Sequence, residues 1–335
     1  MSSLHEKLSP RLTAALPSIL GEVANLPYLT GGHSCGRSGC SILINLDGRG
    51  SPEAAATLLN PRVQAAVQRG GYTLLPGGST RLKPTVGKAI SHDASTGVVA
   101  LKLLDGATEE LQILQRLLAF QSEANHTIKL LDVIKLDTEL SSCCHVIVMP
   151  WQMTLTQCLE EKHFSIRRES LRIQFLEGVA FLHEHGIAHL DLKPGNVLVH
   201  GKSGSLSPRL SIIDFGLSVF AESEETLVEG YRGTPSWAAP EVEENARKYS
   251  AILADRFSCG KVLKYFANTL PIGSAAASEP ICVRLLSSVP GERPSLSAVL
   301  QVLRGAPDPW GVRAEKRGSE ADGATAARKR HHVEW

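Results

Sequence analysis

Three short segments of the chain carry side chains suited to phosphoryl transfer. The first reads His-Leu-Asp-Leu-Lys-Pro-Gly-Asn at 189–196, the second Ile-Ile-Asp-Phe-Gly at 212–216, and the third Gly-Thr-Pro-Ser-Trp-Ala-Ala-Pro-Glu at 233–241. The first two supply carboxylates, a lysine and an amide, which can orient a hydroxyl group and hold Mg²⁺ against nucleotide phosphates. Their order and spacing predict that these groups converge from two loops, and that the third segment ends a loop on which an acceptor would lie.

These segments resemble those of the eukaryotic protein kinase family, and more narrowly its Ser/Thr members. The resemblance covers roughly residues 72–305. It implies an α+β, bilobal fold with a small β-rich lobe at about 72–150 and a larger, mainly helical lobe at about 151–305. The implied reaction transfers the γ-phosphate of ATP to a protein hydroxyl, with ATP and Mg²⁺ as cofactors and a protein as substrate.

The resemblance assigns catalytic roles to residues of the large lobe. Asp191 is the expected carboxylate that orients the substrate hydroxyl, and Lys193 would neutralise charge on the transferred phosphoryl group. Lysine at position 193 is typical of the Ser/Thr members. Thr234 resembles the threonine that ties the substrate-facing loop to both residues. Asn196 and Asp214 would bind Mg²⁺ through oxygen ligands, the type that this cation prefers.

Nucleotide binding is expected to depend on the small lobe. Lys102 ends the run Val-Val-Ala-Leu-Lys and matches the family's strand lysine, which grips the α and β phosphates. Glu110 resembles the helix carboxylate that aims this lysine, with Glu109 as a competing candidate. The short spacing between Lys102 and Glu110 predicts a helix that begins almost directly after the strand.

Residues 149–153 resemble the hinge that joins the two lobes of the family. Met149 is expected at the back of the adenine pocket. The backbone of Pro150, Trp151 and Gln152 would bond the edge of the adenine ring. Proline at 150 lacks an amide hydrogen but keeps its carbonyl, which can still accept a hydrogen bond.

Local patterns predict the elements that position these residues. Strands are expected at 98–104, 128–136 and 145–149, and a helix at 168–185, with Gly186 as its C-cap. The helix is indicated by apolar residues at intervals of three and four, namely Leu171, Phe175, Val179 and Leu182.

Three positions are expected to hold the large lobe together. Glu241 and Arg293 match a buried ion pair of the family, which connects the end of the substrate-facing segment to the late helices. Asp255 matches the helix residue that holds the backbone of the catalytic loop. Their presence supports the expectation of a kinase-like large lobe.

The chain departs from the family in the loop that covers the phosphates. Of the pattern G-x-G-x-x-G only Gly87 is in register, with Leu82 and Pro84 at the first two glycine positions. Side chains there would keep the backbone amides away from the phosphates. The pair at 77–78 would substitute for these glycines if the strand were longer.

Two further departures concern regulation and substrate docking. Leu190 stands where many kinases have an arginine that pairs with a phosphorylated residue, so this switch is not expected here. Ser223, Thr226 and Tyr231 remain candidate modification sites. The interval from Asp255 to Arg293 is shorter than in most of the family, and substrate choice therefore does not carry over.

Two alternatives of other classes stay open at this level. The incomplete glycine loop is compatible with a pseudokinase that acts as a scaffold with weak or no catalysis. Aminoglycoside and choline kinases share a similar H-x-D…N and I-D-F-G pattern, but they lack a protein-substrate loop like the segment at 233–241.

Composition places the chain among ordinary globular proteins. It has 335 residues, of which 43% are hydrophobic, and 35 Lys and Arg against 34 Asp and Glu. The near-neutral balance gives no basic footprint for nucleic acid, and no apolar run is long enough to span a bilayer, so neither nucleic acid nor membrane is expected as a partner. The start lacks the pattern of a secretory signal, and the seven cysteines, an odd number, are interpreted as intracellular thiols.

The two ends of the chain carry no catalytic pattern. Residues 1–71 are expected to form an accessory segment of unknown fold, with helical patterns such as 52–68; His33, Cys35 and Cys40 are too few for a convincing metal site. Residues 306–335 are expected to be a disordered, basic tail. The basic pairs and triplets at 316–317 and 328–330 resemble a two-part signal for a nuclear import receptor, which predicts a location in the nucleus, the cytoplasm or both.

Overall fold

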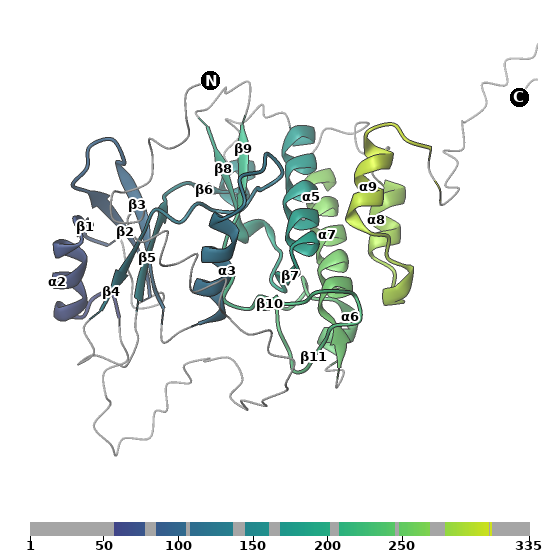
Figure 1. Cartoon of the computed structure of the whole chain (residues 1–335). Coiled ribbons are helices and arrows are strands. Elements are labelled where there is room, and N and C mark those ends of the chain that lie inside the picture. The colour runs from purple at the N-terminus through teal and green to yellow at the C-terminus, as the bar shows by residue number, and fades with distance from the viewer. Residues whose placement is uncertain are drawn as a thin grey trace, which may run out of the picture.

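The structure, a computed structural model, describes residues 57–77, 85–104, 108–136, 145–160, 168–201, 208–244, 248–268, 279–307 and 309. Figure 1 shows a small lobe built on a β-sheet beside a larger lobe built mainly of helices. The expected α+β, bilobal architecture is therefore confirmed. None of the helices in the described ranges is both long and apolar enough to cross a bilayer.

The small lobe contains a five-stranded antiparallel sheet. In spatial order its strands are β1 (Tyr72–Leu74), β2 (Val86–Ser91), β3 (Val98–Leu104), β5 (His145–Pro150) and β4 (Asp132–Lys135). The bounds of β3 are those predicted, whereas β4 is shorter than the predicted 128–136. Ile128 is not in the sheet because its amide donates to the carbonyl of Ile212 in the large lobe, at 2.9 Å.

Alternation along β3 gives the sheet two different faces. Val99, Leu101 and Leu103 are buried in a cluster with Val63 and Val67 of the helix α2 (Pro61–Arg69). This helix begins at Asn60, whose side chain accepts a hydrogen bond from the amide of residue 62. α2 lies before the predicted domain boundary at residue 72, yet it covers one face of the sheet and shares the core of the small lobe.

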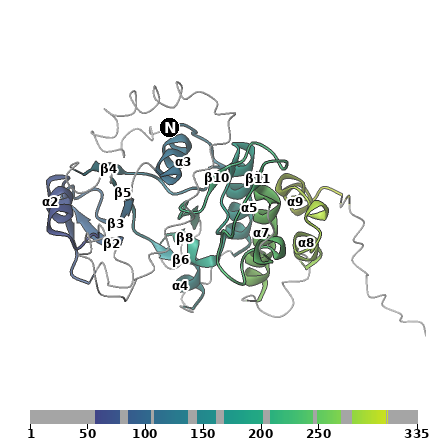
Figure 2. The same ribbon diagram turned by 90° about the horizontal axis from the view of Figure 1, so that it is seen from below.

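The other face of the sheet is turned toward the large lobe. The helix α3 (Glu109–Leu118) lies between the sheet and the large lobe in both views (Figures 1 and 2). Its residues Ile113, Leu114 and Leu117 belong to the same buried cluster as Phe175 of the large lobe. This shared core fixes the orientation of α3 relative to both lobes.

The large lobe consists of helices and short sheets. Its helices are α4 (Leu155–Glu160), α5 (Arg168–Glu184), α6 (Pro240–Glu243), α7 (Ala251–Asn268), α8 (Glu279–Leu285) and α9 (Leu296–Leu303). One sheet contains β6 (Met153–Thr154), β8 (Val197–His200) and β9 (Arg209–Ile212), and two-stranded pairs join β7 (Ile187–Ala188) to β10 (Val219–Phe220) and β11 (Leu227–Val228) to β12 (Tyr249–Ser250).

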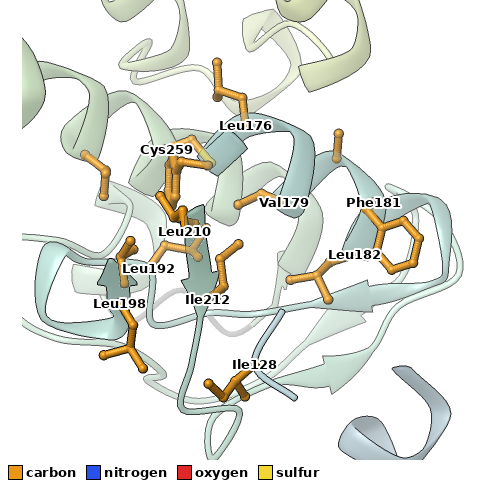
Figure 3. Close-up of a cluster of buried hydrophobic side chains, with 14 of the residues drawn as sticks. Ile128, Leu176, Val179, Phe181, Leu182, Leu192, Leu198, Leu210, Ile212 and Cys259 are labelled. Carbon is orange, nitrogen blue, oxygen red and sulfur yellow. The ribbon is translucent and has the colours of Figure 1, made fainter. Parts of the chain in front are cut away.

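The helix α5 is the centre of the large-lobe core. The predicted apolar face is confirmed, because its members Leu171, Phe175, Val179 and Leu182 are all 0% exposed. Leu176 and Phe181 are buried as well, and Figure 3 shows α5 side chains near Leu210 and Ile212 of β9. A helix that is apolar on several sides is one that neighbours enclose.

Gly186 ends this helix in the predicted manner. Its φ of +67° lies in the left-handed region, which a glycine adopts without steric cost. Its carbonyl accepts a hydrogen bond from the amide of Ala221 at 2.8 Å. The turn therefore directs the chain from α5 into β7 and the catalytic loop.

Candidate active site

The backbone of the catalytic loop is held by one buried carboxylate. Asp255 of α7 is 0% exposed, and its carboxylate accepts hydrogen bonds from the amides of His189 at 2.6 Å and Leu190 at 2.7 Å. It also lies 3.1 Å from Nε2 of His183. The predicted role of Asp255 is confirmed. Leu190 has a φ of +62°, an uncommon conformation for a non-glycine residue, which these bonds help to fix.

The ring of His189 connects the two predicted loops. Its Nε2 donates to the carbonyl of Ile213 at 3.0 Å, since a carbonyl oxygen can only accept. Nδ1 then accepts from the amide of Asp191 at 3.2 Å. The ring is 0% exposed, so this residue locks the segment at 189–196 to the segment at 212–216.

Asp191 lies in a compact polar network. One carboxylate oxygen accepts from Thr234 Oγ1 at 2.6 Å, and the other accepts from Lys193 Nζ at 2.6 Å and from Asn196 Nδ2 at 2.8 Å. Lys193 also donates to Thr234 Oγ1 at 2.5 Å. The structure therefore brings these four predicted residues together, and the predicted link from Thr234 to the catalytic loop is confirmed.

The orientation of the Asn196 side chain leaves its oxygen for another ligand. Its amide nitrogen donates to the backbone carbonyl of Asp191 at 2.9 Å as well as to the carboxylate. Asn196 ends the short 3-10 helix η2 (Pro194–Asn196) and is 5% exposed. The role of Asn196 as a metal ligand stays a prediction, and the amide oxygen is the atom that would serve it.

Lys102 forms a second charged cluster across the cleft between the lobes. Its Nζ lies 2.7 and 2.8 Å from the two carboxylate oxygens of Glu110 and 2.7 Å from Oδ1 of Asp214. Glu110 is 5% exposed, whereas Glu109 is exposed. Glu110 is therefore the partner of the lysine, and α3 begins close after β3, as predicted.

Burial and charge act in opposite directions on this cluster. Burial by itself lowers the pKa of Lys102, but the negative charges of Asp214 and Glu110 outweigh it, and the pKa is raised. Burial raises the pKa of Glu110. Burial is the largest single influence on Asp214 and acts to raise its pKa, but the charge and hydrogen bond of Lys102, together with the charges of His189 and Lys193, outweigh it, and the pKa is lowered. The lysine is thus held as a cation between two acids.

Asp214 is the most accessible group of this cluster. It has a φ of +69°, and its side chain is 45% exposed. A Cβ on Gly216 would stand 3.5 Å from both Asp214 Oδ1 and Glu110 Oε2, an ordinary van der Waals distance. The backbone at 216 therefore lies near the two acids without a steric need for glycine.

The strand register places an additional cation in the cleft. Lys102 is paired with Val86, and Ala100 is paired with Lys88 on one side and Met149 on the other. Paired residues point to the same face of a sheet, so Lys88 and Met149 share the cleft face with Lys102. Met149 therefore lies where a residue at the back of an adenine pocket would be.

Gly87 points to the opposite side. It is paired with Leu101, which packs under α2, so its α-carbon faces the core of the small lobe. Its expected part in nucleotide binding stays a prediction that depends on its backbone. Leu82, Pro84 and Gly78 lie outside the described residues.

The hinge has one aromatic ring at its surface. Trp151 is 39% exposed, and Nζ of Lys88 lies 4.9 Å from the centroid of its ring. The amide of Trp151 donates to the carbonyl of Val98 at 3.5 Å, and Pro150 has no amide hydrogen. Of the three predicted hinge residues, Gln152 is therefore the candidate donor to an adenine edge.

The end of the substrate-facing segment is anchored as predicted. The Arg293 guanidinium forms two bonds with the Glu241 carboxylate, at 2.6 and 2.8 Å, and its side chain is 0% exposed. It also donates to the carbonyls of Leu253 and Ser287. A bidentate pair with these additional acceptors satisfies the buried guanidinium.

Two residues near the site were missed by sequence reasoning. Lys88 could have been found from alternation alone, had the register of β2 against β3 been known. Arg256, a buried cation in the second turn of α7, adjoins Asp255 and is 6% exposed. No local pattern distinguishes it from the other charged residues of this helix. The candidate metal ligands His33, Cys35 and Cys40 lie outside the described residues, and the described ones contain no group of three or more His, Cys, Asp or Glu side chains that could hold a metal ion.

The fold and the two charged clusters agree with the comparison to known families. The family model described as "Protein kinase domain" matches residues 84–301, and the chain belongs to this family. The sequence is 39% identical over 90 residues to CBL-interacting serine/threonine-protein kinase 8 of Arabidopsis thaliana, covering 27% of this chain and 19% of that protein.

Two other similar proteins are also protein kinases that match this chain over part of their length. CBL-interacting protein kinase 24 of Oryza sativa subsp. japonica is 28% identical over 181 residues, 51% of this chain and 38% of that protein. Serine/threonine-protein kinase 17A of Oryctolagus cuniculus is 42% identical over 89 residues, 26% of this chain and 22% of that protein. The chain thus matches less than two fifths of the length of each of these relatives.

Proposed function

We propose that the chain is an ATP-dependent protein kinase that phosphorylates serine and threonine hydroxyls of a protein substrate. The observation that carries this proposal is the network of Asp191, Lys193 and Thr234. It joins the catalytic carboxylate to the segment on which a protein substrate would lie. Relatives named as Ser/Thr kinases support the same acceptor class.

The network defines what each residue does when a substrate hydroxyl approaches. Asp191 accepts the hydroxyl hydrogen bond, which aligns the oxygen for in-line attack. Lys193 stands within bonding distance of that carboxylate and supplies positive charge next to the transferred group. Thr234 keeps the substrate-facing segment at the correct distance from both.

The donor atoms in the cleft fit a magnesium nucleotide. Asn196 offers an amide oxygen and Asp214 an accessible carboxylate, which are ligands of the hard oxygen type that Mg²⁺ takes. Bound Mg²⁺ would neutralise phosphate charge during transfer. Lys102, which is ion-paired with Glu110, would bind the phosphates, and Gln152 and Met149 would contact the adenine.

The proposal is tested by turnover of purified protein with Mg²⁺-ATP and generic peptide acceptors. Asp191→Asn should lower kcat by about 10²- to 10⁴-fold, the usual contribution of a positioned acid or base. Phosphoamino-acid analysis should find phosphoserine and phosphothreonine. Wild-type turnover no higher than that of Asp191→Asn, with folding intact, would favour the pseudokinase scaffold instead.

We also propose that the basic tail binds a nuclear import receptor. The basic residues at 316–317 and 328–330 lie outside the described residues, and their two-part spacing motivates the proposal. Replacing Arg328, Lys329 and Arg330 by alanine should move a fluorescent fusion toward the cytoplasm. A control with lysine at 328 and 330 keeps the charge and should stay nuclear. Equal distributions for all three proteins would remove the idea.

A further inference from the structure

The substrate-facing segment is attached to α7 by an arginine. Arg256 follows Asp255 directly and is 6% exposed. Its Nη2 is ion-paired with the carboxylate of Glu224, and its Nη1 donates to the backbone carbonyl of Arg293 at 3.1 Å. A single buried guanidinium therefore joins the segment at 216–241 to the core helix of the large lobe.

The burial of Arg256 makes this attachment specific. Its Nε is buried without a hydrogen-bond partner, so the guanidinium depends on the contacts of its two terminal nitrogens. A buried charge that loses its partner is left uncompensated in a poorly polarisable surrounding. Arg256 therefore favours the conformation in which Glu224 stands beside it.

A hydrogen-bonded turn presents Glu224 to the arginine. The amide of Thr226 donates to the carbonyl of Ser223 at 3.1 Å, and the amide of Glu225 donates to Oγ of Ser223 at 3.3 Å. Glu224, whose side chain is 48% exposed, pairs with Arg256, whereas the neighbouring Glu225, which is also exposed, bonds back to Ser223. The turn thus directs one of two adjacent acids at the core.

Arg256 and Arg293 connect the two ends of the segment at 216–241 by hydrogen bonds and ion pairs. The carbonyl of Arg293 accepts from Arg256, while the Arg293 side chain holds Glu241 at the other end.

A second ion pair of the segment is much more exposed. The side chains of Lys248 and Glu229 are 61% and 68% exposed, and exposed pairs contribute little to stability.

The position that carries the regulatory arginine in many kinases is apolar here. Leu190 is 4% exposed and packs in a cluster with Val219, Ala221 and Ala239 of the segment. This leucine stabilises the segment by burial but offers no charge for a phosphate group. The charged anchor of the segment lies on α7 instead.

We propose that Arg256 and Glu224 are positioning residues that replace the phosphorylation switch. Their ion pair holds the substrate-facing segment in the conformation that docks a protein acceptor, with no added phosphate. The proposal rests on the proposed kinase function for its kinetic test, but its effect on the segment is measurable without turnover.

The decisive variant is Glu224→Gln, which keeps shape and removes the charge, with Glu225→Gln as the matched control. The KM for an acceptor peptide should rise about tenfold in Glu224→Gln, because a charge-assisted hydrogen bond to Arg256 is replaced by a weaker neutral one, while the KM for ATP stays unchanged. Glu224→Asp should restore part of the loss. Phosphatase treatment should leave wild-type activity unchanged.

Hydrogen exchange gives the second measurement. Amides at 221–233 should exchange faster in Glu224→Gln than in Glu225→Gln. This difference does not depend on turnover, so the measurement distinguishes failure of this proposal from failure of the kinase proposal. Arg256→Met should reproduce the exchange pattern if it folds. Identical exchange and identical peptide KM in the two glutamine variants, or wild-type activity lost on phosphatase treatment, would overturn the proposal.

Discussion

The two sides of the cleft differ in how completely they retain the groups of a kinase site. On the large-lobe side, Asp191, Lys193, Asn196 and Thr234 form one network of short hydrogen bonds. On the small-lobe side, a single lysine cluster around Lys102 is preserved, and the neighbouring strand β2 places a lysine on the cleft face. The comparison shows that the groups expected to act in transfer and those expected to bind nucleotide lie in two separate hydrogen-bond clusters.

The difference also extends to stability. Two buried charged residues support the large-lobe network. Asp255 lies on α7, and Arg293 directly follows the 3-10 helix η3 (Pro290–Glu292). The small-lobe cleft face rests on strand register and on α3. Removing a large-lobe anchor should therefore cost more unfolding free energy than changing a cleft-facing strand residue, whose main effect should be on binding.

The largest effect is expected for Arg293→Ala. The variant leaves Glu241 and two carbonyls without a partner, which should cost on the order of 3 to 5 kcal/mol of unfolding free energy. Urea denaturation followed by circular dichroism measures this. Glu241→Gln, which keeps a hydrogen-bonding group, is the milder companion. A loss below about 1 kcal/mol in Arg293→Ala would show that the large lobe does not depend on this anchor.

The next effect is expected for Lys102→Met. Removing the cation should lower turnover by about 10²- to 10³-fold, as for other groups that stabilise a transition state electrostatically. The thermal midpoint should change little compared with that of Arg293→Ala. Calorimetry together with a Mg²⁺-ATP turnover assay measures both. Equal unfolding of the two variants would contradict the division between the sides of the cleft.

A smaller effect is expected for Lys88→Val, which removes the cation near Trp151. Loss of that contact should change nucleotide affinity or local stability by about 0.5 to 1 kcal/mol. The change in Trp151 fluorescence on titration with Mg²⁺-ATP reports on the site. Lys129→Val, on the surface away from β2, serves as the charge-matched control. An affinity change equal to that of the control would mean that Lys88 plays no part in the cleft.

The smallest effect concerns acid stability. The pKa of Asp214 is lowered below its ordinary 3.8. Its ionised form therefore stabilises the fold above pH 3.8, and this contribution is lost as the pH falls through the folded-state pKa. The difference in unfolding free energy between wild type and Asp214→Asn should be smaller at pH 3 than at pH 6. A difference that grows on acidification would reverse the expected sign.

Much of the site was predictable because its residues lie in short, contiguous motifs. Asp191, Lys193 and Asn196 fall within one loop, and the spacing of Lys102 and Glu110 fixes where α3 begins. The apolar period of α5 likewise needs only neighbouring residues. Residues that are close in sequence are also close in space, so their spacing along the chain is enough to predict their relative positions.

Other features depend on pairing between distant segments. The length of β4 changed because Ile128 bonds to Ile212, and α2, which lies before the predicted boundary of the small lobe, covers the sheet. Neither contact has a local signature, since each is selected by the burial of apolar surface from separate parts of the chain.

The sequence by itself determined the family, the fold class and the identity of the groups that would perform transfer. Only the tertiary structure decided which side of the sheet Lys88 and Gly87 face and that Glu110 rather than Glu109 meets Lys102. It also decided that Arg256 reaches Glu224. The reason is that the sequence specifies each side-chain type directly, whereas strand register and the burial of a charge depend on how distant segments pack together.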